Sequence, residues 1–140
     1  MFERLGLIGC GLMGGSFALA LKRAGLVQRV AGYSRSPASS RRARELGVID
    51  EDVATAAQAA TGADLVLLAV PVAATESTLR ALQPALTADM LIMDVGSTKS
   101  DVAAAAARAL GERADVFVPC HPITGREVAG VEHADPHLYR

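Results

Sequence analysis

The chain contains no tryptophan and few aromatic residues, so its core must be built from aliphatic side chains and its many alanines. Its formal net charge of −1 lacks the basic excess that binding to nucleic acid or to an anionic membrane requires. No apolar run is long enough to span a bilayer, and we expect no signal peptide before the first apolar segment. The only two cysteines, Cys10 and Cys120, lie too far apart for a metal-ligand motif. These absences favour a cytoplasmic protein with reduced thiols, no metal, and no nucleic-acid or membrane partner.

A glycine-rich turn near the start of the chain is the strongest positive signal. An apolar run ending at Ile8 leads into glycines spaced G-x-G-x-x-G at Gly9, Gly11 and Gly14, and helix formers follow over 17–23. In a strand–turn–helix unit, the first glycine allows the turn, the second lets a pyrophosphate approach the backbone, and the third permits close packing. The helix N-terminus, with Leu12 and Met13, adds N–H groups and a positive dipole end. The pattern predicts a bound dinucleotide; the alternative is a strand–helix turn without a ligand.

Strand and helix signals alternate along the rest of the chain, which predicts one dinucleotide-binding domain over residues 1–140. The expected fold is a doubly wound, Rossmann-type parallel sheet (class α/β) with helices on both faces. Strands are expected at 5–8, 26–33, 48–50, 65–70, 91–95 and 116–118. Helices are expected at 17–23, 37–46, 53–60, 72–82 and 100–110. The alanine run at 103–107 indicates a helix packed tightly on the sheet.

In such a sheet, ligands bind beyond the carboxyl ends of the strands, at the topological switch point. Loops 9–14, 34–36, 96–99 and 120–127 should therefore meet at one crevice. Val70 and Pro71, at the end of the clearest buried strand, are further candidates for cofactor contact. The chain ends without a helix stop, which suggests a domain truncated at its C-terminal end and belonging to a longer enzyme.

The residues after the second expected strand bear on the choice of dinucleotide. NAD enzymes usually place Asp or Glu there to bind the ribose 2′-hydroxyl. This chain has Ser34, Arg35 and Ser36 instead, two hydroxyls and a cation that suit a 2′-phosphate. The sequence therefore favours NADP over NAD. In an NAD enzyme, Arg35 would instead stack on adenine or lie in solvent.

Two further loops contain residues that a bare sheet would not need. Ser97 offers a hydroxyl at the end of a strand; it, or equally Ser100, fits the N-cap of the following helix. His121 lies between two prolines on the ligand side of the sheet, where histidine suits a general base near neutral pH. The alternative is a loop histidine bonded to backbone. Glu127 either orients His121, gates the pocket, or is a solvated acid.

These motifs together resemble one enzyme family. The segments 6–16, 69–72, 94–99, 121–127 and 130–139 are similar, in order, to the prephenate/arogenate dehydrogenases of tyrosine biosynthesis. The first segment is generic, whereas 94–99 and 121–127 are far more specific. The resemblance implies oxidation of the ring hydroxyl of prephenate or arogenate, hydride transfer to NAD or NADP, and loss of CO2.

The resemblance also implies roles for single residues. His121 matches the catalytic histidine that accepts the hydroxyl proton, and Ser97 matches the serine that hydrogen-bonds near that hydroxyl and the nicotinamide. Glu127 matches an acid associated with active-site access. Arg126 stands where many members have a small residue. The family's helical second domain, which forms a homodimer and supplies arginine to the substrate, is absent from this chain, so the fragment alone is expected to have little activity.

Two other functions fit part of the pattern. A β-hydroxyacid dehydrogenase also has G-x-G-x-M-G, but it uses a lysine base on a later helix and leaves the 121–127 loop unexplained. A non-catalytic NADP-binding redox sensor would need no histidine held between prolines. Replacement of His121 separates these alternatives, because only the dehydrogenase of the resembled family needs that base.

Overall fold

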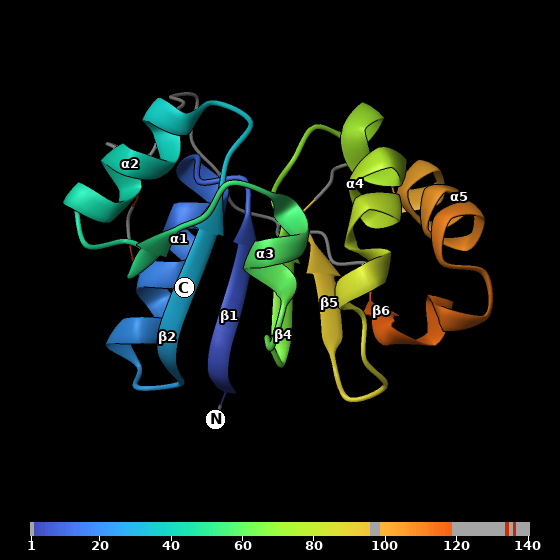
Figure 1. Cartoon of the computed structure of the whole chain (residues 1–140), viewed down its shortest axis with the longest axis horizontal. Coiled ribbons are helices and arrows are strands. Elements are labelled where there is room, and N and C mark those ends of the chain that lie inside the picture. The colour runs from blue at the N-terminus through green and yellow to red at the C-terminus, as the bar shows by residue number, and fades with distance from the viewer. Residues whose placement is uncertain (1, 96–98, 119–133, 135, 137–140) are drawn as a thin grey trace.

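The computed structural model describes residues 2–95, 99–118, 134 and 136. Within that part, the strands form one parallel sheet in the order β3-β2-β1-β4-β5-β6, which confirms the doubly wound fold (Figure 1). The strands are β1 (Phe2–Ile8), β2 (Val27–Tyr33), β3 (Glu51–Asp52), β4 (Leu65–Leu68), β5 (Leu91–Asp94) and β6 (Phe117–Val118). The helices are α1 (Leu12–Arg23), α2 (Pro37–Glu45), α3 (Ala56–Ala60), α4 (Thr75–Leu82) and α5 (Lys99–Leu110).

The order of the strands reverses at β1, which pairs with β2 on one side and β4 on the other. Ile8 lies opposite both Tyr33 and Leu68, and Leu68 lies opposite Asp94, so four strands end at one level. Because all are parallel, their carboxyl ends lie at the same edge, and the described loops after β1, β2 and β4 emerge there. This arrangement creates the switch-point crevice that the alternating pattern predicted.

Two hydrophobic cores, one on each face of the sheet, hold the helices in place. On one face, α1 and α2 cover buried side chains that include Leu5, Leu7 and Leu67. On the other face, α3, α4 and α5 pack over residues that include Ile8 and Val66. The sheet strands are therefore apolar on both sides, as buried parallel strands are expected to be.

A glycine in β1 lets α3 approach the sheet closely. A Cβ on Gly6 of β1 would lie 2.6 Å from the carbonyl oxygen of Ala59 in α3, so only glycine leaves room for this helix. In α5, Ala105 and Ala106 are buried in the core, whereas Ala104 and Ala107 are exposed. α5 contacts chiefly α4 rather than the strands, so the alanine run does not pack tightly on the sheet as expected.

Several expected boundaries were wrong. The third strand is not 48–50 but Glu51–Asp52, because Val48 and Ile49 fill the core while Asp50 bonds through its carboxylate to the N–H of Val30. The third helix begins at Ala56 rather than 53, since Thr55 forms a capping box with Gln58.

The remaining differences lie at the ends of elements. β4 stops at 68, β5 at 94, and β2 begins at 27, each one or two residues inside the expected strand. Residues 72–74 form a 3₁₀ turn before α4, and Val116 ends another, Gly111–Val116, before β6. Ser100 lies within α5, which begins at Lys99, so Ser100 is not its N-cap. α1 and α2 span 12–23 and 37–45, so only α1 is much longer than expected.

Candidate functional site

The turn between β1 and α1 has the geometry expected of its glycines. Gly9 has φ +100°, and a Cβ there would lie 2.2 Å from the carbonyl oxygen of Ala69. A Cβ on Gly14 would lie 2.3 Å from the carbonyl oxygen of Gly9, so this position holds the helix against the turn. At Gly11, by contrast, a Cβ would meet nothing within 4 Å. Two glycines are needed for packing, and the third leaves the backbone open to solvent or a ligand.

The N-terminus of α1 points to the same place and is free of acidic side chains in its first turn. Gly11 is the N-cap residue and provides no side-chain cap. The N–H of Gly15 bonds to the carbonyl of Gly11 at 2.9 Å, which is the first bond of the helix ladder. Leu12 is buried and Met13 half-buried, so the open part of this turn is at Gly11. An anion would meet the positive end of the helix dipole here.

A cavity of about 540 Å³ lies beside this turn, where β1, β2 and β4 end and α4 begins. Four of the predicted contact residues line it: Gly9, Arg35, Val70 and Pro71. The remaining lining residues are Ile8, Tyr33, Ala56, Ala69, Ala74, Ser77, Thr78 and Ala81. The wall is mainly apolar and of a size that suits a small ring system.

The helical wall of this cavity was not predicted from the sequence. Its residues Ala74, Ser77, Thr78 and Ala81 recur at the i, i+3, i+4, i+7 spacing of one helix face. That row of small side chains was the available signal. The Ser77 and Thr78 hydroxyls donate to the backbone carbonyl of Ala74 at 3.1 and 2.7 Å, so both hydroxyls are bonded to the backbone of their own helix.

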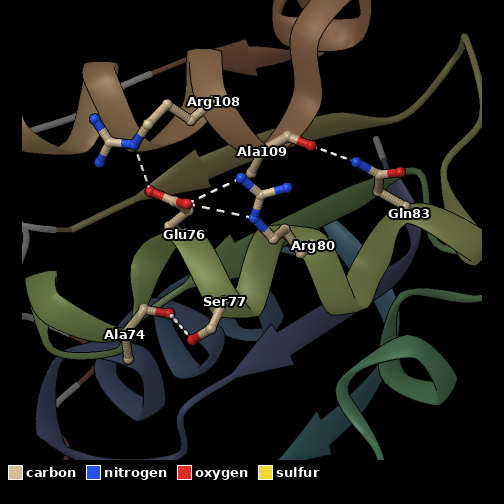
Figure 2. A network of polar contacts seen from close by, with 7 residues as sticks. All are labelled: Ala74, Glu76, Ser77, Arg80, Gln83, Arg108 and Ala109. Atoms are coloured by element: carbon tan, nitrogen blue, oxygen red, sulfur yellow. Dashed lines mark hydrogen bonds and ion pairs between the residues drawn. The ribbon is translucent and has the colours of Figure 1, made fainter.

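Contacts between α4 and α5 fix the position of that wall (Figure 2). The Glu76 carboxylate accepts from Arg80 on its own helix at 3.0 Å and from Arg108 on α5 at 2.5 Å. These hydrogen bonds, first that from Arg108, hold the pKa of Glu76 below its usual value. At the other end of α4, the Gln83 amide donates to the carbonyl of Ala109. Both ends of the helix are therefore tied to α5.

The segment after β2 contains no carboxylate and joins the glycine-rich turn directly. The N–H of Gly9 donates to the carbonyl of Tyr33 at 2.8 Å, and the N–H of Cys10 donates to the Ser34 hydroxyl at 3.0 Å. Arg35 is exposed at the cavity mouth. Ser36 is the N-cap residue of α2, but its side chain makes no capping hydrogen bond. Hydroxyl, guanidinium and a helix N-terminus thus follow one another at the end of β2.

Cys10 is buried, at 2% exposure, in the middle of the glycine-rich turn. Burial raises the pKa of its thiol, and the hydrogen bond with Ser34 only partly opposes that effect. The thiol is therefore protonated and unreactive at neutral pH, in keeping with a packing role. Cys120 lies outside the described residues. Among the residues that the structure describes, no group of three or more His, Cys, Asp or Glu side chains could hold a metal ion.

The predicted catalytic residues Ser97, His121 and Glu127 lie outside the described residues. What the structure does describe is the strands that precede two of them. β5, beside β4, ends at Asp94, and β6, beside β5, ends at Val118.

Comparison with known proteins identifies the family. A family model described as "Prephenate dehydrogenase, nucleotide-binding domain" matches residues 17–140. A cyclohexadienyl dehydrogenase of Zymomonas mobilis is 35% identical over the whole chain, and a prephenate dehydrogenase of Bacillus subtilis is 36% identical over 99% of it. The chain spans 47% and 38% of the lengths of these two relatives.

Solved structures agree with the sequence matches. The prephenate dehydrogenase of Aquifex aeolicus, in complex with hydroxyphenyl propionate and NAD+, superposes with a TM-score of 0.89 at 35% identity, covering 99% of this chain and 48% of that one. The arogenate dehydrogenase of Synechocystis gives 0.84 at 29% identity, covering 97% and 46%. A 3-hydroxyisobutyrate dehydrogenase of Mycobacterium tuberculosis, at 19% identity and a TM-score of 0.72, shares the fold alone. The chain therefore belongs to the prephenate dehydrogenase family and corresponds to its nucleotide-binding domain.

Proposed function

We propose that this chain is the cofactor-binding part of an enzyme that oxidises and decarboxylates prephenate or arogenate in tyrosine biosynthesis. The observation that carries the proposal is the open glycine-rich turn beside an apolar cavity at the switch point, in a chain of this family. The Aquifex aeolicus relative was solved with NAD+ and hydroxyphenyl propionate, a nicotinamide dinucleotide and a substituted phenol-type ligand. A dinucleotide and a ring-bearing acid are therefore the ligand classes that we infer for this chain.

The described residues fit a dinucleotide in three parts. The cavity lined by Tyr33, Val70 and the α4 wall would hold the adenine, because its surface is mainly apolar. The open backbone at Gly11 and the N-terminus of α1 would hold the pyrophosphate. The segment 34–36 would meet the adenosine ribose. When bound, the nicotinamide end accepts a hydride from the substrate carbon.

We infer further that the enzyme prefers NADP+ to NAD+. Segment 34–36 has no carboxylate to receive a ribose 2′-hydroxyl or to repel a 2′-phosphate. The exposed Arg35 guanidinium at the cavity mouth suits a phosphate through charge-assisted hydrogen bonds. Asp52, on the neighbouring strand β3, is paired with Arg44 at 3.2 Å. The uncapped N-terminus of α2 adds a dipole of favourable sign.

The catalytic roles proposed for Ser97, His121 and Glu127 rest on the resemblance to the prephenate/arogenate dehydrogenases. Ser97 follows the last residue of β5 by three positions, and His121 follows the last residue of β6 by three. Because neighbouring parallel strands end at the same edge of a sheet, we expect both residues at the edge where the cavity lies. We propose that His121 accepts the hydroxyl proton, that Ser97 hydrogen-bonds near that hydroxyl, and that Glu127 acts in access to the site. A homodimer, formed by a helical second domain, and a cytoplasmic location also remain predictions.

Calorimetric titration of this chain with NADP+ and NAD+ tests the cofactor proposal. We expect tighter binding of NADP+, and Arg35→Ala should weaken it about thirtyfold, the value of a charge-assisted contact, while sparing NAD+. Arg29→Ala is the matched control, because Arg29 is also an exposed arginine of the β2 region but lies near the opposite end of the strand. Equal loss for both dinucleotides in Arg35→Ala, or a wild-type preference for NAD+, would contradict the 2′-phosphate assignment.

The catalytic proposal is tested in the complete enzyme that contains this chain. Loss of a general base should lower kcat by about a hundredfold or more in His121→Ala, with unchanged affinity for the dinucleotide. His137→Ala serves as the control, since the sequence gives this histidine no catalytic role. Wild-type turnover in His121→Ala would overturn the mechanism, because the base would then have to be another residue.

A further inference from the structure

Three contacts join the glycine-rich turn to the end of β2. The Gly9 N–H bonds to the Tyr33 carbonyl at 2.8 Å, and the Cys10 Sγ lies 3.7 Å from the same oxygen. The third contact, from the Cys10 N–H to the Ser34 Oγ at 3.0 Å, is the one among them whose acceptor is a side chain. It is also the one that replacement of a half-buried side chain can remove while leaving the backbone contact of Gly9 in place.

Loss of this acceptor would leave the Cys10 N–H without a hydrogen-bond partner in a buried position. Cys10 is 2% exposed, so its N–H has little access to water, and an unsatisfied buried donor carries a substantial cost. The next residue is Gly11, whose carbonyl begins the α1 ladder and whose backbone faces open space. If the Cys10 N–H rotated to reach another acceptor, the neighbouring backbone of Gly11 would move with it. That backbone is the part of the turn proposed to face the pyrophosphate.

The hydrogen-bond inventory of Ser34 limits what it can tell apart. Its oxygen already accepts the Cys10 N–H, and the same side chain is also hydrogen-bonded to the Cys10 thiol, so the hydroxyl is engaged within the turn. A neutral hydroxyl held in this way does not distinguish a ribose 2′-hydroxyl from a 2′-phosphate, whereas a carboxylate would favour the first and repel the second. The charge that distinguishes the two ligands lies on Arg35, not on Ser34.

We propose that Ser34 is a positioning residue: through the Cys10 N–H it holds the glycine-rich turn in shape for the pyrophosphate and thereby sets the affinity for both dinucleotides. This inference rests on the proposed dinucleotide site and assigns its two functions to different residues. Ser34 sets the strength of binding, and Arg35 sets the choice between NADP+ and NAD+. Ser34 thus takes a different part from the 2′-phosphate contact expected from the sequence.

Three probes separate these roles: NADP+, NAD+ and adenosine 2′-monophosphate, which lacks the pyrophosphate. Ser34→Ala should weaken NADP+ and NAD+ by the same factor, on the order of tenfold, and leave the monophosphate unchanged. Ser34→Thr keeps a hydroxyl and should restore both affinities. Arg35→Ala should give the opposite pattern, with loss of NADP+ and of the monophosphate but not of NAD+. Loss of NADP+ alone in Ser34→Ala, equal loss of all three probes, or no loss would overturn the proposal.

Amide hydrogen exchange of Cys10 in the ligand-free chain gives an independent test. Ser34→Ala should speed this exchange and Ser34→Thr should restore it, whereas an unchanged rate in Ser34→Ala would overturn the holding role. The measurement also separates this inference from the proposed function. If the wild-type chain bound neither dinucleotide, the proposed function would fail, and the exchange rate would still decide whether Ser34 holds the turn.

Discussion

Gly11 and Gly14 belong to one motif, yet the structure predicts opposite results for their replacement by alanine. The added methyl at Gly14 would lie 2.3 Å from the Gly9 carbonyl oxygen and 3.0 Å from the side chains of Ala69 and Leu7. A backbone oxygen cannot rotate away, so α1 must move. At Gly11 the same methyl meets nothing within 4 Å, and φ of −94° is ordinary for alanine.

The magnitudes follow from these distances. Overpacking at Gly14 should cost about 3 kcal/mol, offset by about 1 kcal/mol from the higher helix propensity of alanine. A net loss of about 2 kcal/mol lowers the Tm of a domain of this size by roughly 7 °C. At Gly11, the poorer N-cap and the less flexible unfolded chain change the free energy of unfolding in opposite directions, for a net change of about 0.5 kcal/mol or less.

Thermal melting and calorimetric titration, carried out together, test this contrast. Gly11→Ala should keep the wild-type Tm and lose at least about tenfold in affinity for NADP+ and NAD+, because its methyl occupies the space left for the pyrophosphate. Gly14→Ala should lower the Tm by roughly 7 °C. The reasoning is refuted if Gly11→Ala melts as early as Gly14→Ala, or if it binds both dinucleotides as the wild type does.

Three further variants test the scaffold. Thr55→Ala removes the N-cap of α3 and should lower the free energy of unfolding by about 1 kcal/mol in urea titration. Leu67→Ala opens a cavity in a fully buried strand and should cost about 3 kcal/mol by the same measurement. Burial would raise the pKa of Asp64, but hydrogen bonds from the N–H groups of Glu3 and Arg4 lower it. Its stabilisation is therefore complete above the carboxyl's unfolded pKa of about 4 and disappears as the pH falls further, so Asp64→Asn should flatten the acid limb of the pH–stability curve.

The alternation of strands and helices was predictable because each buried strand is a short apolar run closed by a turn residue. Local chemistry, rather than pattern, decided the boundaries that were wrong. Val48 and Ile49 have the composition of a strand, but they are buried in the core before pairing with β2 begins at Glu51. The capping box of Thr55 was visible in the sequence and would have placed the start of α3 correctly.

The candidate site was predictable in part for a related reason. Glycine spacing reports backbone geometry directly, so Gly9 and Gly14 were found with their structural roles. The α4 wall was not predicted, because small side chains on a helix face form part of a cavity only when the helix packs beside the glycine-rich turn. Likewise, the Cys10–Ser34 hydrogen bond joins residues 24 apart in the chain, and no local pattern indicates it.

The described cavity has a consequence for how binding and turnover are divided. Its lining comes from residues 8–81, the part of the chain that builds β1, β2, β4 and α4. The predicted catalytic residues follow β5 and β6, later in the chain. Because the two sets come from different parts of the chain, substitution of His121 should change turnover without changing dinucleotide affinity, and substitutions at Gly11 or in 34–36 should change affinity first. Cofactor affinity and kcat should therefore vary independently across these variants, as expected where one set of residues binds the dinucleotide and another acts on the substrate.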